Sequence, residues 1–216
     1  MTNPILPLFN IGPAITGSVL GSPYSQYRCA TANNPISSPS LIRLINAWIT
    51  GDPNGKGDRS PDAAKSWQWF GMFDATLTAP FDYLVGPMGT FFVMSQDVPH
   101  PIRLCRCSHT FTFTEPYQFT TPGKQPAYSG DKRSTEIAIA SGWPGALIQG
   151  TKGDVGGTKL PSDVKMPWYL IFIPGISGVN LRNQLIITDE NGQRYTSSSC
   201  ERTSLGWRIS AALATT

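Results

Sequence analysis

The chain has 216 residues, with 21 glycines, 19 prolines and only 14% charged residues. Its formal net charge of +3 is too small, and its Lys and Arg residues too dispersed, to indicate a nucleic-acid surface. Four cysteines exclude a disulfide-stapled secreted scaffold, and no apolar run approaches the ~18 residues of a membrane-spanning helix. The composition predicts a mainly β protein with many turns, made in a reducing cytoplasm.

Residues 1–37 are rich in proline and apolar side chains and carry a single charge, Arg28. Prolines at this density argue against a helix or a central strand, so we expect an extended apolar N-terminal arm. A solvated tail would carry more charge. The arm can therefore lie against its own domain or against a neighbouring subunit, and the residue pattern leaves both open.

An energy comparison favours the neighbouring subunit. Burying a large apolar side chain gains roughly 1.5–3 kcal/mol, whereas fixing each backbone residue costs about 1–2 kcal/mol. An arm with one large apolar side chain in every few residues needs a groove with walls on two sides. Adjacent subunits of a ring provide such a groove, so we expect the arm to pack across a subunit boundary.

One helix is predicted, over residues 39–50. Ser38 can cap it, Pro39 suits its first position and Gly51 suits its end. The residues at i, i+3, i+4 and i+7 form the apolar stripe of a helix packed on a core: Leu41, Leu44, Ile45 and Trp48.

Residues 38–216 are predicted to form the β-rich domain, with 38–148 and 166–216 as two candidate subregions. A hairpin is expected from residues 82–85 to 90–94, and one continuous strand over residues 105–113, where apolar and polar residues alternate. Further strands are expected at 168–173, 185–188, 193–196 and 207–211. Gly192 can adopt the positive φ of the hairpin loop 189–192. The fold class is a small antiparallel β-sandwich or barrel-like core with one short helix and long loops.

Three polar segments are predicted to be long loops: residues 51–65, 115–133 and 149–165. Loops longer than about 15 residues are uncommon inside compact domains and often contact partners.

Cys105, Cys107 and His109, with His100 nearby, are the strongest candidate metal ligands. On a strand, Cys105 and His109 would lie roughly 13 Å apart, because same-face residues are about 6.6 Å apart. Zinc bonds of about 2 Å cannot gather both residues on one ion. We therefore expect both cysteines to be interior strand residues that bind no metal.

Catalytic patterns are equally weak. Ser177 lies in Gly175-Ile176-Ser177-Gly178-Val179, which lacks the second glycine of a nucleophile elbow. The glycine-rich segment 150–159 matches neither a phosphate-binding loop nor a dinucleotide fingerprint. Asp74 and Asp82 are the best available carboxylates for glycosidase chemistry. The sequence predicts no enzyme, no catalytic or cofactor-binding residue and no cofactor.

The C-terminal third resembles a known group of proteins. Val179-x-Leu181-Arg182 leading to Leu185-Ile186-Ile187-Thr188-Asp189, Gly192 and Tyr195 is similar to small β proteins of the neck, tail and head-completion modules of tailed bacteriophages. The closing segment 203–209 and the middle block 82–93 resemble structural proteins of short-tailed phages and prophages. Thr196 and Ser197 depart from the usual apolar residues after Arg194-Tyr195, and Gln184 replaces a common Asp.

The resemblance implies a structural virion protein. It implies a tail or head–tail connecting subunit that forms a homo-oligomeric ring, contacts other neck and tail proteins, and allows passive contact with passing DNA. It also implies assembly in the cytoplasm of the bacterial host and residence in the virion, without a membrane segment.

An alternative is a β-sandwich module that contacts a glycan or receptor on behalf of the virion. Such a module would use exposed aromatic side chains, for which the candidates are Trp67, Trp69, Tyr117 and Tyr128. Burial of these rings would argue against it.

Overall fold

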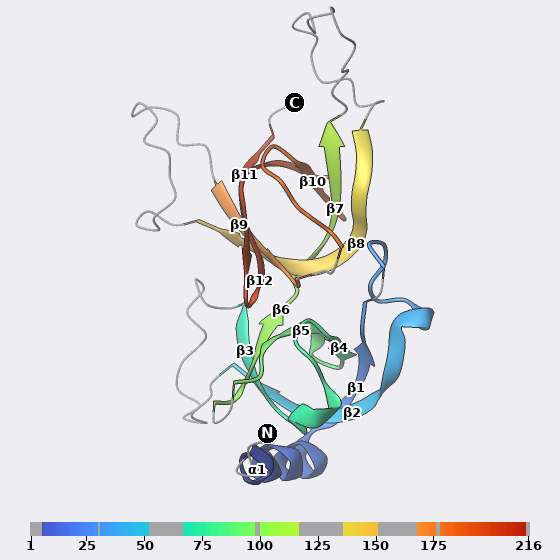
Figure 1. Cartoon of the computed structure of the whole chain (residues 1–216), viewed down its shortest axis with the longest axis vertical. Coiled ribbons are helices and arrows are strands. Elements are labelled where there is room, and N and C mark those ends of the chain that lie inside the picture. Colours follow the sequence, from blue (N-terminus) through green and yellow to red (C-terminus); the bar gives the residue numbers. More distant parts are fainter. Residues whose placement is uncertain are drawn as a thin grey trace, which may run out of the picture.

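Two closed six-strand β-barrels, stacked along the long axis of the molecule, make up most of the chain (Figure 1). The structure, a computed structural model, describes residues 6–29, 31–51, 67–97, 100–116, 136–150, 168–175 and 178–214. All strand pairs within the barrels are antiparallel. The predicted mainly β fold with one short α-helix is therefore confirmed for the described residues.

The N-terminal barrel, barrel one, uses the first half of the chain. Its strands, in the order in which they pair around the barrel, are β1 (Ser22–Tyr27), β2 (Leu41–Thr50), β3 (Gln68–Met72), β6 (Ile102–Arg106), β5 (Gly89–Ser95) and β4 (Tyr83–Gly86). The predicted hairpin of β4 and β5 is present, and Gly89 has a φ of 114° at its turn. Short 3-10 turns lie at Ser38–Ser40 and Ala75–Leu77.

The C-terminal barrel, barrel two, follows immediately. Its strands, again in pairing order, are β7 (His109–Pro116), β8 (Glu136–Gln149), β9 (Trp168–Ile173), β12 (Gly206–Leu213), β11 (Arg194–Thr203) and β10 (Ile186–Asp189). The predicted strands at 168–173 and 207–211 are confirmed, and so is the hairpin loop between β10 and β11, where Gly192 has a φ of 79°. On β12 the predicted alternation holds, since Trp207, Ile209 and Ala211 are buried.

The two barrels share one topology. Numbered from its own first strand, each closes in the order 1-2-3-6-5-4. The chain is therefore a tandem of two equivalent barrels, although no internal repeat is visible in its sequence.

The helix predicted over residues 39–50 is wrong: this segment is strand β2. Ile45, Ala47 and Ile49 point into barrel one, while Leu44, in the supposed apolar stripe, is 70% exposed. Because β1 pairs along one edge of this segment and β3 pairs with its last residues, the hydrogen bonds of barrel closure decide its conformation.

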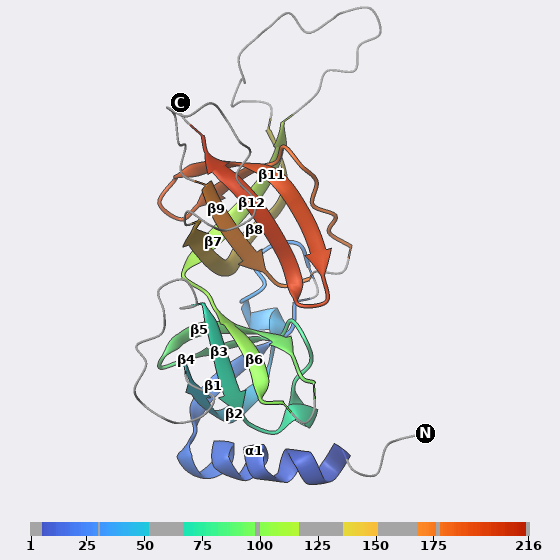
Figure 2. The same cartoon turned by 90° about the vertical axis from the view of Figure 1, so that its left-hand side faces the viewer.

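The predicted extended arm is also wrong, because an α-helix lies there. Helix α1 spans Leu6–Leu20 and continues through Pro13, and β1 follows it as a strand of barrel one. An internal proline costs about 3 kcal/mol in a helix. Tertiary contacts therefore have to stabilise α1, which crosses the end of barrel one and packs on β2 and β3 (Figure 2).

The domain boundary differs from the prediction as well. Barrel one ends with β6 at Arg106 and barrel two begins with β7 at His109, inside the segment predicted as one strand, 105–113. The subregion predicted to end at residue 148 therefore combines barrel one with the first two strands of barrel two. The long loops expected at 51–65, 115–133 and 149–165 lie largely outside the described residues.

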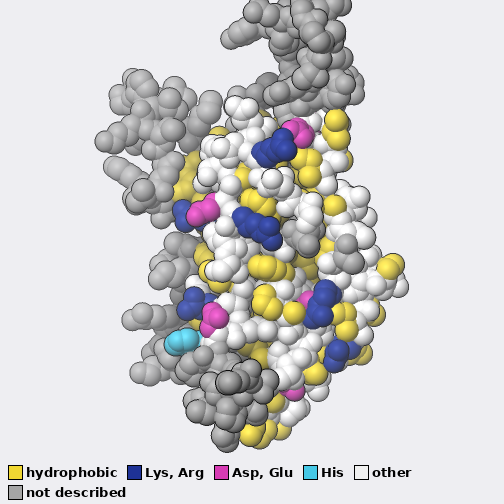
Figure 3. All heavy atoms as spheres, in the orientation of Figure 1, with side chains coloured by type: hydrophobic (Ala, Val, Ile, Leu, Met, Phe, Trp, Pro, Cys, Tyr) yellow, Lys and Arg dark blue, Asp and Glu magenta, His cyan; other side chains and the backbone are white. Residues whose placement is uncertain are grey.

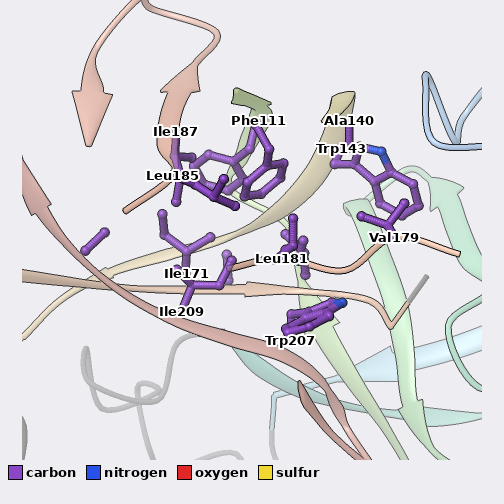
Figure 4. Packing of buried hydrophobic residues seen from close by; sticks show 14 of the residues in the cluster. Phe111, Ala140, Trp143, Ile171, Val179, Leu181, Leu185, Ile187, Trp207 and Ile209 are labelled. Carbon is purple, nitrogen blue, oxygen red and sulfur yellow. The ribbon is translucent and has the colours of Figure 1, made fainter. Parts of the chain in front are cut away.

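The barrels share buried side chains at their junction. Side chains alternate along β4 and β5, so that Leu84, Phe91 and Val93 fill barrel one while Tyr83 and Phe92 face barrel two. Tyr83 and Phe92 belong to one continuous core with barrel-two residues that include Phe111, Trp143, Ile171 and Trp207. Figure 4 shows the barrel-two part of this core. The Tyr83 hydroxyl donates a hydrogen bond to the carbonyl oxygen of Pro144 across the junction, at 2.8 Å.

The connection between β1 and β2 also crosses the junction. The Asn34 amide donates to the carbonyl oxygen of Ser141, and the Trp143 indole Nε1 donates to the carbonyl oxygen of Ala32. Gly142 has a φ of 71°, and a Cβ there would lie 2.2 Å from Asn34 Oδ1. The connection between β1 and β2 is therefore attached directly to strand β8 of barrel two.

Candidate functional site

The predicted metal ligands lie at the boundary between the barrels. Cys105 is buried on β6, Cys107 is in the link that follows, and His109 begins β7. The His109 Nδ1 atom lies 2.9 Å from Glu190 Oε1, so this ring is held by a carboxylate of the β10–β11 hairpin. Within the described ranges, no group of three or more His, Cys, Asp or Glu side chains is arranged to hold a metal ion.

The environment of the cysteines at this boundary disfavours the thiolate form. Burial raises the pKa of the Cys105 and Cys107 thiols, and burial beside nearby thiols raises the pKa of the Tyr83 hydroxyl. A thiol with a raised pKa remains protonated at neutral pH and is neither a good nucleophile nor a good metal ligand. These groups fit the interior of a junction between two barrels.

Of the two carboxylates proposed for glycosidase chemistry, Asp82 is buried and fully engaged. Its two oxygens accept hydrogen bonds of 2.7 Å from Arg28 Nε and from an Arg28 terminal nitrogen. Gln26 Nε2 donates to Asp82 Oδ2 at 2.7 Å, and the Ala79 amide donates to the same oxygen at 2.8 Å. Asp82 therefore fastens strand β1 to the segment before β4, a structural role that the sequence did not reveal.

Asp74 caps the 3-10 turn Ala75–Leu77. Its Oδ1 accepts hydrogen bonds from the amide and the hydroxyl of Thr76, at 2.9 Å and 2.6 Å. Asp74 thus stabilises a local turn, whereas Asp82 connects strand β1 to the segment before β4.

A second buried carboxylate, Asp189, organises the β10–β11 hairpin. Its Oδ1 accepts hydrogen bonds from the amides of Asn191 and Gln193. The Tyr195 hydroxyl shares its one proton between Gln193 Oε1 at 2.9 Å and Asp189 Oδ2 at 3.3 Å. Burial and the charge of Asp189 raise the pKa of Tyr195 to about 12, so its hydroxyl remains a donor at neutral pH. This hairpin is held by side-chain-to-backbone hydrogen bonds, which is typical of a structural turn.

The proposed aromatic binding residues are engaged within the protein where they are described. The Trp67 ring stacks on Phe172 of barrel two, with centroids 4.4 Å apart. The Trp69 ring contacts Phe91, and the guanidinium of Arg106 lies over it at 5.3 Å. Tyr117, Tyr128 and Ser177 lie outside the described residues, and His100 is exposed in the segment before β6.

The most unusual surface is on α1. Ile11, Ile15 and Val19 are 51%, 57% and 73% exposed. Gly17 instead faces barrel one, and a Cβ there would lie 2.6 Å from the carbonyl oxygen of Met72. Each residue advances about 100° around a helix, so Ile15 and Val19, two positions from Gly17, lie on the opposite side.

Over residues 11–20, where its side chains are described, α1 is therefore inverted relative to an ordinary surface helix, which turns its large apolar residues toward the core. No charged residue occurs in Leu6–Leu20. On the face drawn in Figure 3, charged side chains are scattered, whereas hydrophobic side chains are visible at the lower end, where α1 lies in Figure 1. The sequence predicted a covering surface for this segment, and it missed the helical form and the orientation of the segment.

Strand β2 carries a second apolar row at its start. Leu41, Ile42 and Leu44 are 46%, 39% and 70% exposed. The side chains of Ile45 and Ala47 point inward, so Leu44 lies on the outer face of barrel one.

Comparison of the chain with known proteins adds no assignment. None of the helices in the described residues is long and apolar enough to span a membrane. Searches against protein-family models, curated proteins and solved structures find no match.

Proposed function

We propose that the protein is a structural component of a tailed-phage virion. In this proposal it is a tail or head–tail connecting subunit that assembles with copies of itself and with neighbouring virion proteins around the genome exit path. The segments whose sequence resembles phage proteins support it. They lie on β4, β5, β10, β11 and β12 and in the segment before β10.

The observation that carries the proposal is the outward apolar face of α1. Ile11, Ile15 and Val19 are exposed, although a helix turned the other way would bury them. Contiguous exposed apolar surface on a soluble protein marks a contact site, because leaving it in water forgoes the free energy of burial. In an assembly, this face of α1 would be buried against a neighbouring subunit.

The alternative, a glycan- or receptor-binding module, has less support. Stacking on a sugar ring requires an accessible aromatic face. The Trp67 ring already stacks on Phe172, and the Trp69 ring lies between Phe91 and Arg106. The described aromatic candidates are half-buried and already contact other side chains, which leaves less of each ring face for a sugar.

Native mass measurement tests self-assembly. We expect the purified protein to form a closed species whose mass is a multiple of the 23.5 kDa chain. Removal of residues 1–20 takes away α1 but leaves β1, so this variant should retain a β-type circular dichroism spectrum and remain monomeric. A full-length chain that stays monomeric at high concentration would contradict the proposal.

Virion analysis tests location. Particles purified from a host that produces this protein should contain the chain as a stoichiometric component after nuclease treatment and density-gradient separation. Absence of the chain from such particles would rule out a virion role, even if the protein forms oligomers.

A further inference from the structure

We infer that α1 of one copy docks on the outer face of β2 of the next copy, so that the subunits join head to tail. This inference rests on the proposed self-assembly and specifies its contact. The donor surface is the α1 row formed by Ile11, Ile15 and Val19, with Leu20 beside it. The acceptor surface is the β2 row formed by Leu41, Ile42 and Leu44.

The exposed side chains of both surfaces call for an apolar partner. The α1 side chains are 51–73% exposed and the β2 side chains 39–70%. No charged residue of Leu6–Leu20 would have to be desolvated by docking, and in the β2 row only Arg43 is charged. A long arginine side chain can keep its charged end in water while its stem covers apolar surface.

The spacing of the two rows matches. Residues four apart on a helix, such as Ile15 and Val19, are about 6 Å apart along its axis. Leu41 and Leu44 pair with Tyr27 and Ser25, two residues apart on β1, so they are about 6.6–6.8 Å apart along the strand, with Ile42 in the β-bulge between them. Side chains of the two rows can therefore interdigitate when the helix lies along the strand.

The rows belong to different elements, so the contact is heterologous. The inward face of α1 packs on the barrel at Gly17 and its outward row points away, which leaves that row for another copy. A heterologous contact gives each copy one donor and one acceptor surface, and it forms a ring when the rotation closes. Seven apolar side chains bury roughly 700 Å² in all, the size of a weak contact that ring closure would reinforce.

Two charge variants test the pairing. Ile15→Glu disables the donor row and Leu44→Lys disables the acceptor row. Each should weaken self-association at least about 10-fold, because a charge would be buried in an apolar contact. Thr196→Glu, which places a charge at an exposed position of barrel two, is the matched control and should assemble normally. Circular dichroism checks that all three variants are folded.

Mixing the variants gives the decisive result. The Leu44→Lys copy retains its α1 row and the Ile15→Glu copy retains its β2 row, so the mixture should associate in a 1:1 ratio although neither variant associates alone. The double variant, Ile15→Glu with Leu44→Lys in one chain, should recover assembly. Each contact then joins the introduced carboxylate of one copy to the introduced ammonium group of its neighbour.

The outcomes separate the inference from the proposed function. A wild-type protein that is monomeric under all conditions overturns both. If the wild-type protein assembles and Leu44→Lys assembles equally well, the inference fails, and self-assembly remains supported. A mixture that forms no pairs also overturns the inference, because each variant retains the surface that the other one lacks. A symmetric α1–α1 contact would instead leave Leu44→Lys associated with itself.

Discussion

Asp82 shows how a single residue can hold together elements that are distant in the sequence. Its carboxylate is 1% exposed and accepts hydrogen bonds from Gln26, Arg28 and the amide of Ala79. Every one of these partners is a hydrogen-bond donor. A carboxylate has only acceptor oxygens and fits this position, whereas the NH2 group of an asparagine would place two further donors there. The site therefore requires an acceptor-only side chain.

We predict that Asp82→Asn lowers the free energy of unfolding by about 2–3 kcal/mol, because the amide group faces donors and Arg28 loses its counter-charge. Urea denaturation measures the change. Asp74→Asn is the matched control: asparagine caps a turn as well as aspartate does, so a loss below about 1 kcal/mol is expected. Equal losses in both variants would contradict the special role of Asp82.

Glu190 provides a pH-dependent contribution. Burial opposes its ionisation, but hydrogen bonds from the Thr110 amide and its own amide, together with His109, outweigh burial and hold its pKa below the ordinary 4.5. A lowered folded-state pKa means that the ionised side chain favours the folded protein. This contribution is present above pH 4.5 and is lost as the pH falls through the lowered pKa.

The Glu190→Gln variant should therefore be less stable than the wild type near neutral pH, and the difference should shrink in acid. Chemical denaturation from about pH 7 to about pH 3 measures the difference in unfolding free energy. A difference that does not change over this range would show that Glu190 does not supply the predicted linkage.

At the scale of the element, α1 contains two glycines in opposite environments. A Cβ at Gly17 would lie 2.6 Å from the carbonyl oxygen of Met72 and 2.9 Å from Phe73 Cα, whereas a Cβ at Gly12 meets nothing within 4 Å. Gly17 thus permits close approach of α1 to the barrel, and Gly12 only adds backbone freedom.

Gly17→Ala should destabilise the protein by about 1–3 kcal/mol, because the helix must move away from β3. Gly12→Ala should stabilise it by up to about 1 kcal/mol through helix propensity. Thermal unfolding of the two variants measures both signs. The packing of α1 would have to be reconsidered if both substitutions stabilised the protein.

At the scale of the whole molecule, the two barrels share one buried core. Tyr83 of barrel one is fully buried in the core that also contains Phe111 and Trp143 of barrel two. The Trp67–Phe172 stack joins the barrels at a second point. Each barrel therefore buries apolar surface that would be exposed without the other.

We predict that Tyr83→Phe, which removes the hydrogen bond to Pro144, costs about 1–2 kcal/mol and weakens both barrels together. Hydrogen exchange should show faster opening in β4 and β5 and equally in β8 and β9. Phe92→Leu, which also alters the shared core, should show the same spread. Faster exchange confined to barrel one would indicate that the barrels open independently.

The sequence determined the features that depend on neighbouring residues. The bracketed apolar run 168–173 became β9, the alternation at 207–211 became β12, and Gly192 closed the β10–β11 hairpin. Local chemistry is sufficient for these because period-2 patterning and positive φ operate within a few residues.

Only the tertiary structure decided the rest. Residues 41–50 satisfy a helical stripe and a strand equally well, and pairing with β1 and β3 makes them a strand. Helix α1 continues through Pro13 and packs on β2 and β3. Barrel one ends after β6, although the alternation of apolar and polar residues continues to Phe113. The strand order of each barrel and the Arg28–Asp82 ion pair depend on contacts between residues far apart in the sequence. Such long-range contacts produce no periodic pattern in the local sequence, so the sequence did not predict them.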